Sequence, residues 1–510
     1  MTSKRPGLTR RQFIPRAAGL LTALGVGGAA GYELHSGAKP TPAPEPQGFT
    51  ATTVPAAGNP GSGVSSFVTR PELRPADVRI TEVATHGLRN EPRFVVMAPM
   101  ADIAYKSDQR GPMIVDRRGR LIWFDPSEDS TFNVQVQTYE GQRVLTRWHG
   151  ALSDGYGNGV GEIIDETYTP IATVGNAKTR PIDLHEFQLT SRGTALATYY
   201  ETHDWDLSPI GGAKHGLLLV SHALEIDVAT NKTLLDWVSI DHVGIDESYQ
   251  PLPSKASDAF NYFHVNSVAE ASDGNLLISG RNTWCVYKVH RTTGKVIWRL
   301  NGKRSDFKVP DDVGFSWQHH VRAHGESEMT IFDNANISGH GSLALLLQLD
   351  EAKRQVSLKR AFQHPAKFTA WTLGSVQVRP DGHVFVGWGA QPYFSEFSKD
   401  GELLVDGQFN SETRSYRTFL TEWKGHPTDK PTLVARSNQG SGFIIYASWN
   451  GATEIDHWKV LAGSELALEP VGSQPWTGFE TTIVVNSHGP AFQVAAIDRH
   501  GNELGRSEIT

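Results

Sequence analysis

The feature that most constrains the fold is a recurring unit of short apolar strands joined by glycine-containing turns. Each unit has an apolar strand, a second strand that ends in a charged residue, and a third that carries tryptophan or another large apolar side chain. The clearest unit comprises residues 273–279, 286–289 and 294–298. About six such units of roughly 40 to 60 residues follow one another, and none could bury both of its faces alone. They predict the blades of a β-propeller, with a stack of β-sandwich hairpins as the alternative.

Composition agrees with an all-β chain. The 510 residues include 50 Gly and 28 Pro, and 9% are aromatic, which suits many short strands joined by tight turns. We expect a six-bladed propeller over residues 67–429. Residues 430–510 change rhythm, and the segments 446–451, 458–460 and 492–496 alternate like strands of a small immunoglobulin- or fibronectin-like β-sandwich.

The first 35 residues form a predicted export segment. Lys4 and Arg5, and then Arg10 and Arg11, precede a weakly hydrophobic run rich in Ala, Gly and Leu. Paired arginines before such a run are typical of a twin-arginine (Tat) signal. A buried amphipathic helix is the alternative, but this run is apolar all round. We therefore expect the Tat translocon to be a partner and the protein to be exported to the periplasmic, cell-wall or extracellular side. An uncleaved, membrane-anchoring signal stays open.

Residues 36–66 are dense in Pro, Ala, Thr and Gly and predict a flexible linker. The net charge of -7 is mixed in sign, so the sequence offers no basic stripe for nucleic acid. Cys285 is the sole cysteine, so no disulfide can form within the chain.

Common catalytic motifs are missing from the sequence. It has no phosphate-binding Gly-x-x-x-x-Gly-Lys-Ser/Thr loop, no Gly-x-Ser-x-Gly elbow and no His-Glu-x-x-His zinc motif. Polar, histidine-containing segments instead lie between the apolar strands, at residues 183–187, 262–267, 279–282 and 317–322. Because the inner strands of a propeller converge on its axis, these segments are expected to meet in one pocket.

These segments resemble the bacterial and fungal arylsulfotransferases that use no nucleotide sulfate donor. The resemblance extends from about residue 67 to the C-terminus, and it is carried by Asp183-Leu184-His185-Glu186-Phe187, Asp241-His242-Val243, Tyr262-Phe263-His264-Val265-Asn266-Ser267-Val268, Ile278-Ser279-Gly280-Arg281, Gly294-Lys295-Val296-Ile297-Trp298-Arg299-Leu300, Trp317-Gln318-His319 and Ile331-Phe332-Asp333-Asn334. The family fold is a six-bladed propeller with its active site on the axis.

The resemblance also implies a reaction and its residues. His319 matches the histidine that takes a sulfuryl group from an aryl sulfate and passes it to a phenol. His264 and Arg281 match residues that hold the sulfuryl oxygens, and His185 matches a further active-site histidine. No cofactor or metal is implied, and the partners are small phenols and aryl sulfates. Relatives include dimers, so a homodimer is a candidate assembly.

Two positions depart from the family pattern. Asn282 stands where close relatives often carry His, and His320 stands where they carry Asp or Thr. Because adjacent strand residues face opposite sides, His320 is interpreted as a neighbour of the nucleophile. Two other functions remain open, a non-catalytic ligand-binding propeller and a quinone-dependent dehydrogenase propeller.

Overall fold

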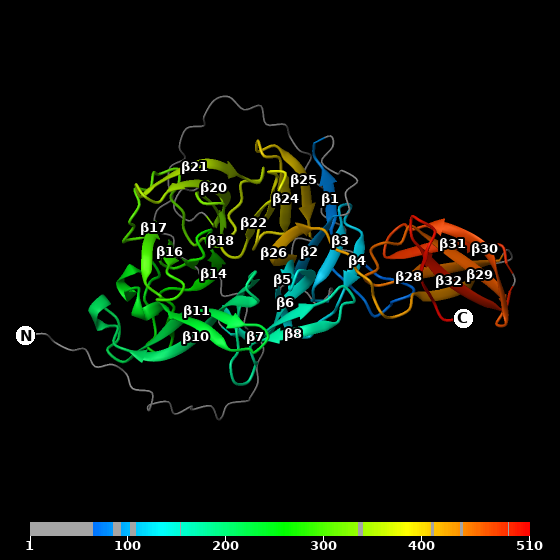
Figure 1. Ribbon diagram of the computed structural model, residues 1–510, viewed down its shortest axis with the longest axis horizontal. Helices are drawn as coiled ribbons and strands as arrows, with labels where there is room; N and C mark the ends of the chain where they lie inside the picture. The colour runs from blue at the N-terminus through cyan, green and yellow to red at the C-terminus, as the bar shows by residue number, and fades with distance from the viewer. Residues whose placement is uncertain are drawn as a thin grey trace, which may run out of the picture. The chain divides into compact units, whose positions relative to one another are not determined.

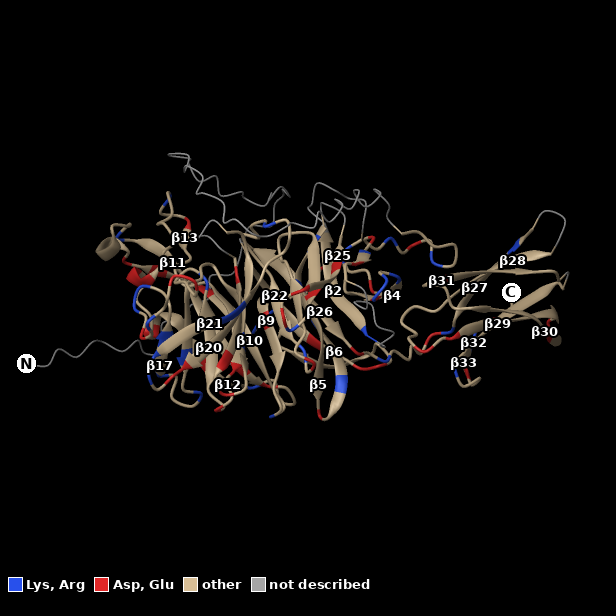
Figure 2. Ribbon diagram, turned by 90° about the horizontal axis from the view of Figure 1, so that it is seen from above, with Lys and Arg blue, Asp and Glu red and all other residues tan. Residues whose placement is uncertain are grey.

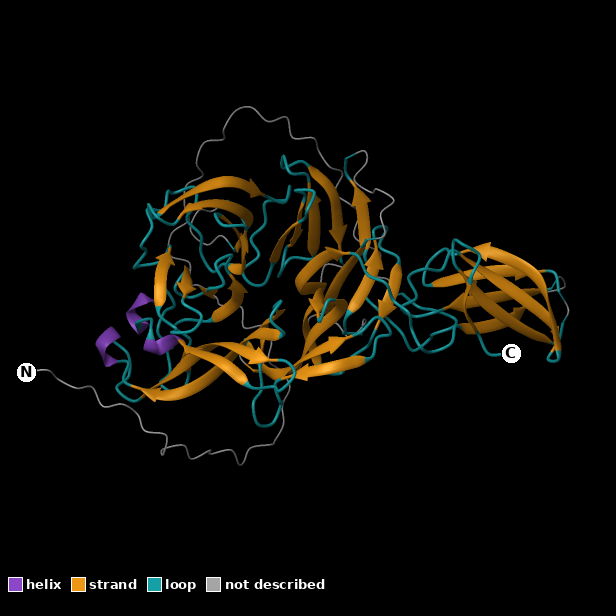
Figure 3. Ribbon diagram, in the orientation of Figure 1, coloured by secondary structure: helices purple, strands orange, loops and turns teal. Residues whose placement is uncertain are grey.

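The structure is a computed structural model that describes residues 65–84, 93–101, 109–153, 155–334, 340–409, 413–438, 442–487 and 489–510 (Figure 1). The described chain consists of strands and loops, with three single-turn 3-10 helices, which are η1 (Ser208–Ile210), η2 (Ser239–Asp241) and η3 (Ile245–Glu247) (Figure 3). The predicted all-β class is confirmed. The predicted Tat segment and nearly all of the predicted linker lie outside the described residues.

Six sheets lie between residues 79 and 421 of the described chain. The first contains β5 (Ser130–Tyr139), β6 (Gln142–Ser153), β7 (Tyr156–Ile164) and β8 (Pro170–Val174). The second contains β9 (Asp183–Leu189), β10 (Thr194–Trp205), β11 (Gly216–Asp227) and β12 (Thr233–Val238), with β13 (Ala259–Phe260) parallel to β11. The third contains β14 (Val265–Glu270), β15 (Leu276–Gly280), β16 (Cys285–Val289) and β17 (Val296–Leu300).

The fourth sheet contains β18 (His319–His324), β19 (Glu328–Asp333), β20 (Leu343–Asp350) and β21 (Gln355–Phe362). The fifth contains β22 (Ser375–Val378), β23 (Val384–Gly387), β24 (Tyr393–Phe397) and β25 (Leu403–Gln408), with β1 (Arg79–Glu82) added at its outer edge. The sixth contains β2 (Phe94–Ala101), β3 (Met113–Asp116) and β4 (Leu121–Phe124), with β26 (Thr413–Thr421) as its first strand.

The two ends of this region are joined by strand pairing. β26 follows the fifth sheet in sequence but pairs antiparallel with β2, and β1 pairs antiparallel with β25. Two consecutive sheets thus each combine strands from both ends of the region. Separating the two ends of this region would break two ladders of backbone hydrogen bonds.

The sheets surround a common centre, and one strand of each faces it (Figure 1). These inner strands contact one another in the cyclic order β5, β9, β14, β18, β22 and β26, and β26 contacts β5 again. The arrangement is propeller-like. It brings segments more than 200 residues apart in sequence to the same axis.

Burial along the strands explains the apolar pattern of the sequence. The first three strands of the third sheet are buried almost throughout, because neighbouring sheets pack on both of their faces. Its outer strand, β17, alternates between buried and exposed positions. Asp-Gly turns join inner strands to second strands, and Gly274 and Gly382 have φ angles of 81° there, a left-handed conformation that favours glycine.

Two further sheets lie in the C-terminal region. One contains β27 (Thr432–Ser437), β28 (Phe443–Ser448) and β31 (Glu480–Val485); the other contains β29 (His457–Ser464), β30 (Ala467–Pro475), β32 (Ala491–Ile497) and β33 (Glu503–Arg506). Side chains from both sheets form one apolar cluster, in which Trp458 and Val460 are fully buried. The predicted segments 458–460 and 492–496 lie within β29 and β32, and the segment 446–451 overlaps the end of β28.

Charged side chains of both signs are interspersed over the strands and loops (Figure 2). Within the described ranges, no helix is long and apolar enough to cross a membrane.

Candidate active site

The four predicted site residues lie at the ends of strands from three neighbouring sheets. His185 lies on β9, His264 directly precedes β14, Arg281 directly follows β15, and His319 begins β18. The register of both β14 and β18 is interrupted by a bulge, and His264 and His320 have positive φ angles of 55° and 52°. Such bulges re-aim the side chains next to them.

His319 is buried, and its two ring nitrogens have different partners. Nδ1 lies 3.0 Å from the carbonyl oxygen of Trp317 and 2.7 Å from Oδ1 of Asn334. The backbone N–H of Leu373 points to Nε2 at 3.3 Å. Since a carbonyl oxygen can only accept and an N–H can only donate, Nδ1 carries the proton and Nε2 the lone pair.

The amide of Asn334 is held in one orientation. Its Nδ2 donates to the carbonyl oxygens of Ala370 at 2.6 Å and Leu373 at 3.0 Å, which leaves Oδ1 for His319. The same side chain therefore fixes the tautomer of His319 and the course of the loop 370–373.

The surroundings keep His319 neutral. Burial, with the nearby Arg281 guanidinium and the His185 ring, holds the pKa of His319 well below its ordinary value of 6.5, although the hydrogen bond that His319 donates to Asn334 opposes this shift. An imidazole with such a pKa is unprotonated at neutral pH and keeps its Nε2 lone pair.

His264 is partly buried and has the opposite hydrogen-bonding pattern. The Asn261 side-chain amide donates to Nδ1 of His264 at 2.7 Å, so Nδ1 accepts and Nε2 carries the proton. Burial, with His185, Arg281 and His319 nearby, holds the pKa of His264 well below its ordinary value. His264 is thus a neutral imidazole whose free Nε2–H can donate.

Arg281 is held from two sides. Its Nη1 donates to Oδ1 of Asn282 at 3.0 Å and its Nη2 to the Trp371 carbonyl oxygen at 3.1 Å. The guanidinium also lies over the Trp317 ring, 4.9 Å from the ring centre. Such fixing presents the planar fork in one orientation, which suits binding of a tetrahedral anion.

His185 forms a buried pair with Asp183. Its Nδ1 lies 2.6 Å from Oδ2 of Asp183, and this carboxylate also accepts hydrogen bonds from Thr198 Oγ1 and from the Gly157 and His185 backbone N–H groups. A carboxylate so placed keeps the proton on Nδ1 and leaves the lone pair on Nε2. It would also stabilise the ring if Nε2 gained a proton.

The structure brings these four predicted residues together. The rings of His185 and His264 are 4.8 Å apart, nearly perpendicular, and Tyr200 packs against both. Arg281 and His185 both lower the pKa values of His264 and His319, which places all four groups in one electrostatic environment. Three imidazoles around one guanidinium form a site suited to an anion.

The two departures from the family pattern lie beside the site. Asn282 is buried, accepts from Arg281 and donates to the Asn261 carbonyl oxygen at 2.6 Å, so it connects the segments that carry Arg281 and His264. His320 is buried on another side of β18 from His319, where its Nδ1 accepts from the Val376 N–H at 3.2 Å. His320 therefore lies beside the nucleophile candidate in sequence but outside its hydrogen-bond network.

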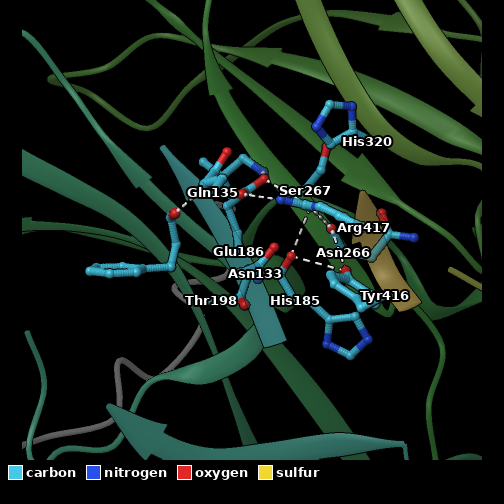
Figure 4. A network of polar contacts seen from close by, with 12 residues as sticks. Asn133, Gln135, His185, Glu186, Thr198, Asn266, Ser267, His320, Tyr416 and Arg417 are labelled. Carbon is cyan, nitrogen blue, oxygen red and sulfur yellow. Dashed lines mark hydrogen bonds and ion pairs between the residues drawn. The ribbon is translucent and has the colours of Figure 1, made fainter. Parts of the chain in front are cut away.

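A buried ion network lies beside these histidines. Glu186 accepts from Arg417 at 2.6 Å and from Arg322 at 3.0 Å, and Arg417 also donates to the backbone oxygens of His185 and Asn266. Figure 4 shows Arg417 between Glu186 and Asn266, with His185 and His320 on opposite sides of the network. Two guanidinium groups against one carboxylate leave a net positive charge, which lowers the pKa values of His319 and His320 further than burial alone.

The sequence analysis gave no role to several partners of the site, namely Asp183, Asn334, Asn261, Glu186, Arg322 and Arg417. The sequence could have indicated Asp183 as a partner of His185, because residues i and i+2 of a strand share a face. The network of Glu186, Arg322 and Arg417 joins three sheets, and no local sequence pattern indicated it. Among the described residues, no group of three or more His, Cys, Asp or Glu side chains is placed to hold a metal ion.

Comparison with known proteins bears on the identity of the chain. A family model described as arylsulfotransferase (ASST) matches residues 135–410, which is more than half of the sequence and includes all four predicted site residues. No curated protein matches the chain.

Solved structures give only distant likenesses. A protein of unknown function from Bacteroides caccae is 9% identical, with a TM-score of 0.39 over 65% of this chain and 99% of that chain. A protein of unknown function from Dyadobacter fermentans is 12% identical, with a TM-score of 0.34 over 68% and 100%. Virginiamycin B lyase from Staphylococcus aureus is 9% identical, with a TM-score of 0.31 over 68% and 99%. By the family match, which covers more than half of the sequence, the chain belongs to the arylsulfotransferase family of sulfotransferase enzymes.

Proposed function

We propose that this protein transfers a sulfuryl group from an aryl sulfate ester to a phenolic acceptor through a sulfohistidine at His319. The observation that carries the proposal is the fixed tautomer of His319. Nδ1 is bound to Asn334 and the Trp317 carbonyl, so the lone pair lies on Nε2, in a ring that burial keeps neutral. A neutral, oriented imidazole is the form that attacks an electrophile.

The first half-reaction is a displacement at sulfur. Nε2 of His319 forms a bond to the sulfur atom, and the bond from sulfur to the ester oxygen breaks. The aryl group leaves as a phenolate or, with a proton, as a phenol. The Leu373 N–H, which points at Nε2, has to give up this contact as the new bond forms.

Arg281 and His264 supply the donors for this step. Charge on a sulfuryl group in flight should spread over its oxygens as it does on a phosphoryl group, so positioned donors lower the barrier. The Arg281 fork stays protonated, and the Nε2–H of His264 is free because Asn261 occupies Nδ1. Both donors flank one hairpin, β14–β15, which lies next to the His319 strand.

His185 is suited to move the proton. In the second half-reaction the acceptor phenol loses its proton to Nε2 of His185 while its oxygen attacks the sulfur, and the bond from sulfur to His319 breaks. Asp183 stabilises the imidazolium so formed. That proton then leaves Nε2 and balances the phenolate released in the first half-reaction, so the enzyme ends each turnover as it began.

The fold supports an axial site. We propose that the six sheets are the blades of one β-propeller, with residues 67–429 as the catalytic domain, and that the two C-terminal sheets form a separate sandwich in residues 430–510. The cyclic contacts of the inner strands favour the first assignment. The apolar cluster shared by both C-terminal sheets favours the second.

We also propose that residues 1–35 direct export through the Tat translocon. Changing Arg10 and Arg11 together to Lys should keep the protein inside the cell, because the translocon reads the pair as an address. Unaltered export of the double variant, measured by fractionation, would remove this part of the proposal.

The mechanism is tested by trapping the intermediate. Purified protein incubated with 4-nitrophenyl sulfate and no acceptor should gain about 80 Da, the mass of one SO₃ group, on His319. The digest is kept neutral or alkaline because the sulfur–nitrogen bond should be labile to acid. His319→Ala should lose both the adduct and transfer to phenol.

A matched control lies on the same strand. His324, at the far end of β18, donates to or accepts from Thr330 Oγ1 and is outside the site. His324→Ala should keep both adduct and transfer. An adduct on His185, or full transfer by His319→Ala, would overturn the assignment. Steady release of nitrophenol without acceptor would mean sulfatase behaviour rather than transfer.

A further inference from the structure

Trp371 is an exposed indole next to the site. Its exposed fraction is 50%, whereas Trp148, Trp237, Trp298 and Trp388 are at most 1% exposed. Trp371 is the one tryptophan of the described residues whose side chain is exposed, and exposed aromatic surface beside a site commonly meets a ligand.

The backbone around Trp371 is fixed. Its carbonyl accepts from Arg281, and the carbonyls of its neighbours Ala370 and Leu373 accept from Asn334. The Ala370 N–H donates to Ser342 Oγ at 2.7 Å. The indole is therefore presented by a segment with a defined course.

This segment joins the two groups on which transfer depends. The Trp371 carbonyl oxygen accepts a hydrogen bond from Arg281, and two residues later the Leu373 N–H points at Nε2 of His319. Two residues span at most about 7 Å of chain. An aryl ester whose sulfur lies at Nε2 would thus place its ring within reach of the Trp371 indole.

A second indole supports the first. The Trp317 ring lies 5.8 Å from that of Trp371, and the Arg281 guanidinium lies over its face. The three groups combine a cation for the sulfate with aromatic surface for the ring. This pairing matches an aryl sulfate, whose charge and ring are adjacent.

We propose that the Trp371 side chain is the stacking surface for the aryl ring of donor and acceptor, and so a determinant of specificity for planar aromatic substrates. The inference rests on the proposed function, since it assigns the ring of that same substrate. Stacking on an indole favours larger and electron-poor rings. Trp371 contributes its side chain to binding, while its carbonyl keeps its bond to Arg281 in any variant.

Direct binding separates this inference from the reaction. In the His319→Ala background, which cannot form the adduct, titration calorimetry measures the Kd of 4-methylumbelliferyl sulfate and of inorganic sulfate. Adding Trp371→Ala should weaken binding of the aryl sulfate about tenfold, as for loss of one stacked ring, and Trp371→Phe should recover part of it. Inorganic sulfate, which has no ring, should bind as before.

Tyr249 provides the matched control. It is 38% exposed and stacks on Trp284, which lies three residues after Arg281. Tyr249→Ala should leave the Kd unchanged. The inference is overturned if Tyr249→Ala weakens binding as Trp371→Ala does, if Trp371→Ala weakens inorganic sulfate equally, or if Trp371→Ala has no effect. Absence of any aryl sulfate binding in the His319→Ala parent would instead count against the proposed function.

Discussion

The surroundings of His319 and of His264 differ in which ring nitrogen they leave free. At His319 the Asn334 amide offers its oxygen to Nδ1, and the lone pair remains on Nε2. At His264 the Asn261 amide offers its nitrogen to Nδ1, and the proton remains on Nε2. Both rings are neutral and both have lowered pKa values. Two similar histidines, each held by one asparagine, thus become a nucleophile candidate and a donor candidate.

The comparison teaches that residue type alone does not assign a role on this axis. A neutral imidazole is donor at one nitrogen and acceptor at the other, and the neighbouring group chooses between them. His185 has the same hydrogen-bonding pattern as His319, since Asp183 holds its Nδ1 proton and leaves the lone pair on Nε2. The site accordingly has two histidines that offer a lone pair and one that offers a proton.

The largest of the following effects is expected for His185→Ala, which tests whether the second lone pair acts as a base. Transfer to phenol should slow by about 100- to 10,000-fold, the usual contribution of one general base. The burst of 4-nitrophenolate in the first half-reaction should change little, because this leaving group departs without a proton. Rapid-mixing kinetics of each half-reaction check the difference, and equal slowing of both would assign His185 to binding.

Arg281→Lys removes the fork shared by the two histidines. We expect turnover to fall by about 100-fold, as for loss of one transition-state donor, because an ammonium group cannot reproduce two parallel hydrogen bonds. The melting temperature should change little, since the residue is only partly buried. If the melting temperature of the variant falls while its specific activity is unchanged, Arg281 is a structural link between sheets and not a catalytic residue.

The asparagine pair sharpens the comparison itself. Asn334→Ala frees the His319 tautomer and the 370–373 loop, and should slow sulfuryl adduct formation about tenfold, at the low end of effects for residues that orient a functional histidine. Asn261→Ala releases only the tautomer of His264 and should slow adduct formation about threefold. Single-turnover burst rates measure both. Equal effects, or a reversed order, would contradict the assignment of nucleophile and donor.

Features that depend on residues close in sequence could be predicted from the sequence, whereas contacts between distant segments could not. The all-β class and the strand segments followed from local patterns, and the four site residues followed from motif resemblance. Asp183 could have been assigned, because it lies two residues from His185 on one strand. Asn334 approaches His319 only because β18 and β19 pair, and Trp371 and Leu373 approach because the loop after β21 folds back. Arg417 meets Glu186 from 231 residues away, and no local pattern encodes that.

The smallest effect is expected for a change in pH, and it tests the feature that both histidines share. An ordinary imidazole is half protonated near pH 6.5, and a His319 of that kind would lose half of its nucleophile there. Burial and Arg281 lower the pKa of His319 well below 6.5, so the neutral form should persist as pH falls through that value. His264 keeps its Nε2 proton in either protonation state, so it adds no loss. The burst rate of 4-nitrophenolate should therefore stay constant from pH 8 to 6.5 and decline only at more acidic pH. Stopped-flow measurement at a wavelength where nitrophenol and nitrophenolate absorb equally gives this profile, and a midpoint near pH 6.5 would show that His319 titrates like an exposed imidazole.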